Sequence, residues 1–432
     1  MQTSRYLLIG AVTGFLCVPA YLWGQDAGQK QPQCKDQQEC DLYNAILQDN
    51  TPKTKLEKLQ QWQKQNPETQ FAEVRRNLLI TTYVAVGQPK EAVAVAKQSL
   101  AANPKDFNAL YYTMLLTQSL YGASQQPAVL DDGEKASKAL IAGIDAPPPG
   151  VTADQWAKLR PGVEALSHTT LGFVGMQRKS WDAAEAEFKK ALQVNPNNSA
   201  VDYSLGFTLA SKKDNSNALF YYARAAAYDG EGSLSAQQRQ GVQAEVQKMY
   251  NIYHGNSDGF SNLLASAKTQ PNPPDGFHIE SKAEIAKKAA EAQVASEEKL
   301  AKENPALALW KNIKEQLNGS DGANYFNSGM KGTKVPTLRG KVVKLEPETR
   351  PKTLTLALED GTTADATLKF ETALPGKVEP GTELSFEGVP DSYTTSPFMV
   401  VFNVDKEDLH GWTGKNAPAP RKSAGKKSSA AK

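Results

Sequence analysis

The sequence has few of the residues on which catalytic and metal sites depend. Its 432 residues include only three cysteines and four histidines. His168, His254, His278 and His410 are scattered, and none has a nearby cysteine or carboxylate at the spacing typical of a metal centre. The sequence contains no glycine-rich phosphate loop, dinucleotide fingerprint or paired-carboxylate motif. We therefore expect no cofactor, no metal site and no enzymatic activity.

One short motif is typical of a catalytic site but lies in the wrong context. Residues 255–259, Gly-Asn-Ser-Asp-Gly, match the nucleophile elbow of a hydrolase, in which a β-strand must precede the serine. Here the preceding residues have helical spacing. A helix that ends at Gly255, with Ser257 or Asp258 capping the next helix, explains the motif without catalysis. An exported hydrolase with a cryptic site near Ser257 or in the C-terminal domain is the alternative.

The N-terminal apolar run is too short for a membrane span. Arg5 precedes an apolar run that ends near Pro19, whereas a span needs roughly 20 apolar residues. Small residues around Ala20 fit a signal peptidase site. We interpret residues 1–24 as a secretory signal peptide, with an uncleaved anchor as the alternative. The protein is then exported, and it is periplasmic, associated with the cell envelope or secreted.

Two cysteines, Cys34 and Cys40, lie in the segment 25–50 that follows the predicted signal peptide. Export would place them in an oxidising compartment, where a disulfide is allowed. Neither cysteine has a histidine or a second cysteine pair nearby to complete a zinc site. A disulfide and two unpaired thiols are the two interpretations of this pair.

The C-terminal tail, residues 413–432, is basic. It contains six lysines and arginines and no acid, so its charge is +6 while the whole chain carries only +2. Its Ala/Pro/Ser/Gly composition predicts disorder. The tail either keeps the protein soluble or makes weak contacts with anionic components of the envelope.

The strongest pattern is an internal repeat with a period of 34 residues. Each copy has a Leu-Gly pair, two alanines that flank an aromatic residue, and a proline or glycine at the end. Small residues let antiparallel helices approach closely, aromatic residues fill the space between helix pairs, and proline cannot continue a helix. The copies are Leu171, Gly172, Ala184, Phe188, Ala191 and Pro196, and then Leu205, Gly206, Ala218, Tyr222, Ala225 and Gly230.

This repeat resembles the tetratricopeptide repeat (TPR) family, whose helix pairs stack into a curved solenoid. A further copy runs through residues 79–104, with alanine in place of the aromatic residue. Upstream, Leu56, Leu59 and Trp62 have helical spacing and predict a lone second helix that closes the stack. We therefore expect a mostly α-helical protein with a TPR-like solenoid over residues 51–270.

Residues 271–333 are expected to connect this solenoid to a second domain. The prolines at 271–274 break the chain. Residues 281–303 are rich in Ala, Glu and Lys and predict a solvated connector helix. A second helix after Pro305 has one apolar face that should pack, formed by Leu307, Trp310, Ile313 and Leu317.

Residues 334–412 have the alternating hydrophobic pattern of β-strands, separated by turn sequences such as Asp360-Gly361. Five short strands predict a small β-barrel, with a curled sheet as the alternative, and the barrel is similar in architecture alone to the oligonucleotide/oligosaccharide-binding fold. The predicted strands are residues 341–345, 354–358, 366–370, 384–389 and 398–402.

The charge of this β unit argues against nucleic-acid binding. Residues 335–412 contain 8 Lys/Arg and 13 Asp/Glu, a net charge of −5, which would repel phosphate groups. Its phenylalanines could form a stacking platform for bases, but their phase along the strands fits a core face better. These are Phe370, Phe386, Phe398 and Phe402.

The resemblance to the TPR family implies a groove that binds an extended peptide, because in that family the first helix of each pair lines the concave surface. The matching positions lack the Lys/Arg/Asn set with which some relatives hold a terminal carboxylate. We therefore expect apolar and aromatic contacts. The alternative is that Phe173 and Phe207 simply pack between helices. The groove positions are Asn77, Thr81, Phe173, Met176, Gln177, Tyr203, Phe207 and Ser211.

The sequence thus predicts a non-catalytic adaptor of the cell envelope that binds a protein segment in the solenoid groove. The partner and the oligomeric state are not specified by the sequence. A protein that binds envelope polysaccharide or lipid through the β-barrel and the basic tail is a further alternative.

Overall fold

The computed structural model describes residues 33–414, which divide into two compact units. Unit 1 extends to Glu284 and unit 2 starts at Ile285. The predicted signal peptide, residues 1–24, and most of the predicted basic tail, residues 415–432, lie outside the described residues, so both stay predictions. Within the described part of the chain, none of the helices is long and apolar enough to cross a membrane.

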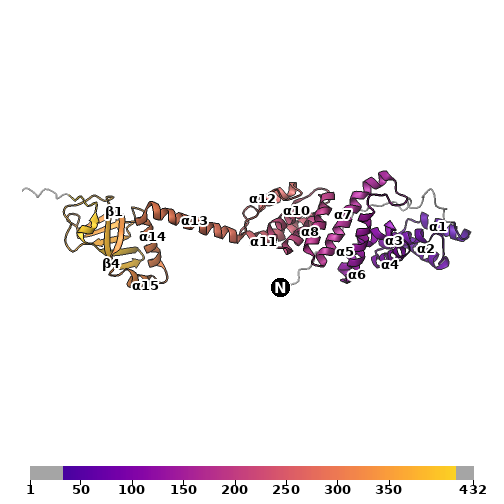
Figure 1. The fold of residues 1–432 in the computed structure, drawn as a ribbon, viewed down its shortest axis with the longest axis horizontal. Coiled ribbons are helices and arrows are strands. Elements are labelled where there is room, and N and C mark those ends of the chain that lie inside the picture. The colour runs from indigo at the N-terminus through magenta and orange to yellow at the C-terminus, as the bar shows by residue number, and fades with distance from the viewer. Residues whose placement is uncertain (1–32, 415–432) are drawn as a thin grey trace, which may run out of the picture. The chain divides into compact units, whose positions relative to one another are not determined.

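Unit 1 is an array of helical hairpins that is similar to a TPR solenoid (Figure 1). Each hairpin has a first helix and a second helix, and these alternate along the chain. The helices are α1 (Gln37–Gln48), α2 (Pro52–Gln65), α3 (Ala72–Ala85), α4 (Pro89–Ala102), α5 (Phe107–Ser124), α6 (Pro127–Ala142), α7 (Ala153–Gln177), α8 (Trp181–Val194), α9 (Ser199–Ser211), α10 (Asn215–Ala227), α11 (Ala236–His254) and α12 (Phe260–Thr269).

Neighbouring helices of unit 1 pack in the order of a solenoid. The partners within each pair, such as α7 with α8 and α9 with α10, make extensive contacts, and each second helix also contacts the first helix of the next pair. First helices touch one another as well, α3 with α5, α5 with α7 and α7 with α9. Residues 165–230 therefore form two successive helix pairs, as the repeat predicted.

The repeat residues lie where the helices of a pair approach most closely. A Cβ atom on Gly172 would come within 2.6 Å of the Phe188 ring, and one on Gly206 within 3.0 Å of the Tyr222 ring. Both glycines thus leave room for the aromatic residue 16 positions later in the same pair. Phe188 is only 1% exposed, so its ring has no free space into which it could move.

The predicted lone helix at the N-terminal end is wrong, because α1 packs against α2. The structure joins Cys34 and Cys40 by a disulfide, with the two Cα atoms 5.5 Å apart, so that the segment before α1 is linked to the start of that helix. Buried Glu39 on α1 accepts a hydrogen bond from Nε1 of Trp62 at 2.8 Å. The sequence pattern missed this helix because α1 presents only two buried residues, Glu39 and Ile46.

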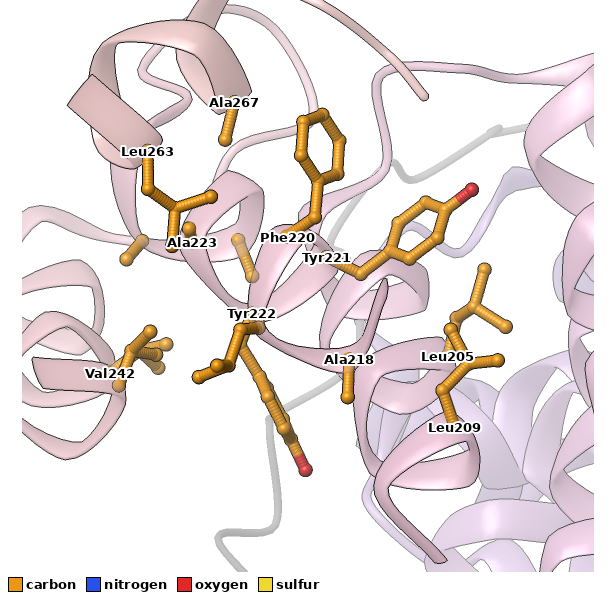
Figure 2. Close-up of a cluster of buried hydrophobic side chains, with 14 of the residues drawn as sticks. Leu205, Leu209, Ala218, Phe220, Tyr221, Tyr222, Ala223, Val242, Leu263 and Ala267 are labelled. Carbon is orange, nitrogen blue, oxygen red and sulfur yellow. The ribbon is translucent and has the colours of Figure 1, made fainter. Parts of the chain in front are cut away.

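The second half of unit 1 has the larger core, which surrounds α10 (Figure 2). The α10 helix contacts α9, α11 and α12, so ten of its thirteen residues are buried. Beyond α12, the extended segment 271–281 adds Ile279 to this core. Its peptide N–H donates to Ser216 Oγ of α10 at 3.1 Å, and the same hydroxyl donates to the Ile279 carbonyl.

Unit 2 contains a closed ring of strands next to a helix. The ring follows the order β1-β2-β3-β5-β4 and closes by pairing of β1 with β4, and only the β3–β5 pair is parallel. The prediction of five strands needs one correction, since a short sixth strand, β6, pairs with β4. The strands are β1 (Val335–Glu346), β2 (Thr353–Ala357), β3 (Ala366–Lys369), β4 (Glu383–Thr395), β5 (Phe398–Asn403) and β6 (Leu409–His410).

The helices before the ring differ in burial. The connector helix α13 (Lys282–Glu303) has no buried residue, whereas α14 (Pro305–Asn318) packs on β1 and buries Trp310, Ile313 and Leu317. The α14 helix therefore contributes to the core of unit 2. A short helix, α15 (Gly322–Tyr325), and a π-helical turn, η2 (Phe326–Met330), lead into β1.

One buried carboxylate links α14 to the ring of strands. Asp365, at the start of β3, accepts a hydrogen bond from Nε1 of Trp310 at 2.8 Å and another from the Leu358 peptide N–H at 2.7 Å. Burial raises the pKa of Asp365, and the two hydrogen bonds oppose this rise because they favour the charged form.

We expect Gly172→Ala to destabilise unit 1 by about 1–3 kcal/mol, because its methyl group overpacks against the fixed Phe188 ring. The matched control is Gly241→Ala on α11, where no atom lies within 4 Å of the new Cβ. The control should stabilise the helix by about 0.5–1 kcal/mol through propensity. Urea unfolding of both variants, followed by circular dichroism, tests this pair. Equal effects of the two changes would contradict the close-approach role of Gly172.

Replacement of Asp365 by alanine should lower the free energy of unfolding of unit 2 by roughly 2–4 kcal/mol, because it leaves two buried donors without an acceptor. Glu371→Ala, at an exposed acid beyond the end of β3, is the control and should change stability little. Chemical unfolding monitored by tryptophan fluorescence measures both. An Asp365→Ala protein as stable as the control would show that this carboxylate does not hold α14.

Candidate functional site

The eight predicted groove residues lie on the first helices of three pairs, and all eight are half-buried. We call the surface formed by these residues the first-helix face. Its members on α7 and α9 belong to helices in contact, whereas those on α3 are separated from α7 by α5. They are Asn77 and Thr81 on α3, Phe173, Met176 and Gln177 on α7, and Tyr203, Phe207 and Ser211 on α9.

The polar side chains of this face are largely engaged by the protein itself. Thr81 Oγ1 donates to carbonyl oxygens of its own helix, and Ser211 Oγ donates to the Phe207 carbonyl at 2.9 Å. Asn108 on α5 donates its Nδ2 hydrogen to Asn77 Oδ1 at 3.2 Å. This bond bridges α3 and α5 and engages the side-chain oxygen of Asn77. The other side-chain polar atoms of the two asparagines stay available to a ligand.

Each aromatic side chain of the face contacts a second ring. Phe173 lies 6.0 Å from Tyr121 of α5, and the two rings are nearly perpendicular. Phe207 lies 6.1 Å from Trp181 of α8, and Tyr203 lies 5.1 Å from Tyr222 of α10. Such edge-on contacts fix the orientation of the rings. The aromatic residues of the first-helix face thus pack between helices and still expose part of their surface.

An acidic residue lies beside the α9 end of the face. Burial raises the pKa of Tyr203 and of Tyr222, and the negative charge of Glu245 on α11 raises both further. Glu245 is exposed, and Met249, one helical turn later, packs against the same core as Tyr203. This contribution of α11 was not predictable from the repeat, because the glutamine-rich sequence of α11 does not follow the 34-residue pattern.

Behind the face lies a buried charged pair. Arg224 of α10 has its Nε atom 3.4 Å from Oδ2 of Asp202 on α9, and both side chains are buried. Burial raises the pKa of Asp202 well above its usual value, and Arg224 opposes this rise. Neither carboxylate oxygen of Asp202 has a hydrogen-bond partner in the structure. The preceding repeat has His168 at this position, where its Nδ1 pairs with Glu187 at 2.6 Å.

Arg224 also ties together three segments of unit 1. Its guanidinium donates to the carbonyl oxygens of Ala267 and Gln270 at the end of α12, at 3.1 and 2.8 Å. It donates in addition to the Pro196 carbonyl at 3.0 Å, in the turn between α8 and α9. The backbone around the α9 end of the face therefore depends on this side chain.

The residues around Ser257 do not have the arrangement of a nucleophile elbow. Ser257 lies in the turn between α11 and α12, so no strand precedes it, and Nδ1 of His254 pairs with the Glu280 carbonyl rather than with the serine. Gly255 ends α11 with a left-handed conformation, as predicted. The predicted cap by Ser257 or Asp258 is wrong, because Gly259 is the residue before α12 and no side chain caps that helix.

A pocket of about 320 Å³ lies between α8, α9, α10 and the segment 273–277. Two of its polar side chains already have partners in the protein. Lys189 pairs with Glu185 at 2.6 Å, and the Tyr221 hydroxyl donates to Asn272 at 3.1 Å. Among residues 33–414, no group of three or more His, Cys, Asp or Glu side chains is arranged to hold a metal ion.

Several solved structures are similar in fold to part of the chain, whereas no protein-family model and no curated protein sequence matches it. PilF of Pseudomonas aeruginosa is 17% identical over 54% of this chain and 87% of its own, with a TM-score of 0.34. TTC0263, a TPR protein of Thermus thermophilus, is also 17% identical, covering 49% of this chain and 95% of its own, with a TM-score of 0.29.

A third structure, MamA of Desulfovibrio magneticus RS-1, is 14% identical over 48% of this chain and 95% of its own, with a TM-score of 0.33. The chain is thus similar to TPR structures over about half its length. This similarity concerns the fold of the hairpin array alone.

We expect Arg224→Met to destabilise unit 1 by about 3–5 kcal/mol, because it leaves several buried carbonyl groups without their donor and the Asp202 carboxylate without its counter-charge. Asp202→Asn should cost less, since its carboxylate accepts no hydrogen bond that the amide would lose. Thermal unfolding of the two variants measures the difference. If Asp202→Asn were the more destabilising change, the charge pair rather than the carbonyl contacts would be the main contribution of Arg224.

Proposed function

We propose that the protein is a non-catalytic adaptor that acts outside the cytoplasm and binds a polypeptide segment on the first-helix face. The observation that carries this proposal is the row of aromatic side chains on α7 and α9. Phe173, Tyr203 and Phe207 are each fixed by a second ring and keep part of their surface exposed. Fixed aromatic side chains bind a partner at low entropic cost and are typical anchors of protein interfaces.

The surrounding residues favour a peptide over a small metabolite. The face lies on the first helices α3, α7 and α9 rather than enclosing a deep cavity, which suits an extended chain. Asn77 and Asn108 offer amide groups that can hydrogen-bond to a peptide backbone at the α3–α5 end. The export signal predicted for residues 1–24 and the disulfide between Cys34 and Cys40 support a location in the cell envelope or outside the cell.

Selection from a random peptide library displayed on phage, with the full mature chain as bait, tests this function. We expect selected peptides, remade as acetylated and amidated synthetic peptides, to bind in fluorescence anisotropy. Tyr203→Ala combined with Phe207→Ala should weaken this binding by at least about 10-fold, because hot-spot aromatic residues carry most of the energy of such interfaces.

Lys189→Ala on α8 is the matched control, since Lys189 belongs to a second helix and is exposed. This variant should bind the same peptides as the wild type. Failure to select any peptide, or equal binding by the double variant with its circular dichroism spectrum unchanged, would refute the first-helix face as the binding surface.

A further inference from the structure

We propose that the binding surface continues across α5, and that the polypeptide bound there carries no charged side chain where it crosses α5, α7 and α9. The polypeptide is that of the proposed function, on which this inference rests. We give the name uncharged strip to the six residues of the first-helix face on α7 and α9 together with Tyr111, Leu115 and Gln118 of α5.

The α5 helix lies between the two groups of predicted groove residues, because it contacts both α3 and α7. Near its start, Asn108 donates to Asn77 of α3 at 3.2 Å. Near its end, the Tyr121 ring lies 6.0 Å from the Phe173 ring of α7. One side of α5 therefore faces the first helix before it, and another side faces the first helix after it.

Three half-buried residues form the side of α5 that lies between these two contacts. A helix has about 3.6 residues per turn, so positions 111, 115 and 118 fall within the arc between positions 108 and 121. The Tyr111 ring is held by the Phe107 ring, whose centroid is 6.1 Å away and whose plane is nearly parallel. The surface thus continues from α3 through α5 to α7. The three residues are Tyr111, Leu115 and Gln118.

The first helices of this region carry almost no charge. Residues 107–124 of α5 contain no Asp, Glu, Lys, Arg or His. Among these residue types, residues 165–177 of α7 contain only His168 and α9 contains only Asp202, and both side chains are buried. By contrast, the second helices α6 and α8 carry five acidic and basic residues each. The charges of this part of unit 1 are thus concentrated on the second helices.

The cations that directly follow α7 and α9 are bound by acids of the second helices. Arg178 binds Asp131 and Glu134 of α6. Lys212 binds Glu185 of α8 in the same way. These ion pairs hold the two cations toward the second helices, so they do not add charge to the uncharged strip.

A surface of this kind favours a partner of the same kind. A charged side chain that is laid against half-buried apolar and aromatic residues loses water and meets no counter-charge in the strip, which weakens binding. Apolar side chains gain from burial, and the amides of Gln118 and Gln177 can hydrogen-bond to a peptide backbone. The strip ends at α9, because the next first helix, α11, has the exposed charged residues Glu245 and Lys248. The segment that fits is therefore an extended chain of apolar and neutral polar residues.

The peptide library of the preceding section tests the uncharged strip. We expect the peptides selected on the wild-type chain to lack Asp, Glu, Lys and Arg at the positions that they share. Lysine or aspartate at one of these positions should weaken binding by at least about 10-fold, whereas glutamine should weaken it less. Gln118→Lys should likewise weaken binding of the neutral peptides by about 10-fold, and selection on this variant should bring Asp or Glu to one position.

The matched control is Gln193→Lys, the same change at an exposed residue of the second helix α8. This control should leave the affinity and the selected sequences unchanged. Peptides that lose affinity in the Tyr203/Phe207 double variant but share a charged position, or that bind Gln118→Lys as tightly as Gln193→Lys, would overturn the uncharged strip and leave the adaptor function intact. The absence of any selected peptide would instead refute the adaptor function itself.

Discussion

Unit 1 depends on the close approach of two helices at a glycine that faces an aromatic ring. Gly172 faces Phe188 in the pair α7–α8, and Gly206 faces Tyr222 in the pair α9–α10. These contacts set the distance between the two helices of each pair. The same distance decides how far the side chains on the first helices are buried. Tyr203 reaches the Tyr222 ring because Gly206, three residues later on α9, lets α10 come near. The first-helix face is thus a consequence of the packing within each pair, and its rings keep their positions as long as that packing holds.

The sequence predicted the structure best where the same packing contact recurs and the same residue types occupy it. Glycine, alanine and an aromatic residue at fixed offsets predicted the helix pairs α7–α8 and α9–α10, and a copy with alanine in place of the aromatic residue predicted the hairpin α3–α4. The alternating pattern likewise predicted the first five strands, because each strand buries one face in the core of unit 2. These features follow from local periodicity, so a single sequence is sufficient to find them.

Features that depend on contacts between distant residues could not be predicted in this way. The α1 helix packs through Glu39 and the Trp62 indole, and a buried glutamate does not look like a core residue in a hydrophobic pattern. Tyr121 of α5 contacts Phe173, and Trp181 of α8 contacts Phe207. Neither of these two partner rings belongs to the 34-residue pattern. Glu245 contributes charge from α11, a helix outside the repeat. The groove positions implied by the TPR resemblance are all half-buried, but their aromatic partners and the charge beside them required the fold.

The first and last repeats of a helical array have a neighbour on one side only, whereas each interior repeat is covered on both sides. This chain uses a buried arginine near each end. Arg75 donates to the carbonyl oxygens of Asn66 and Pro67, and Arg224 to those of Pro196 and Gln270. A guanidinium has five N–H donors in a fixed plane, so one side chain can satisfy several backbone carbonyls that have no partner at the end of a helix. Near the C-terminal end this arrangement leaves Asp202 as the counter-charge on α9, where the preceding repeat has His168. The charged residue at this position therefore accompanies the arginine that satisfies the carbonyl groups near this end of the array.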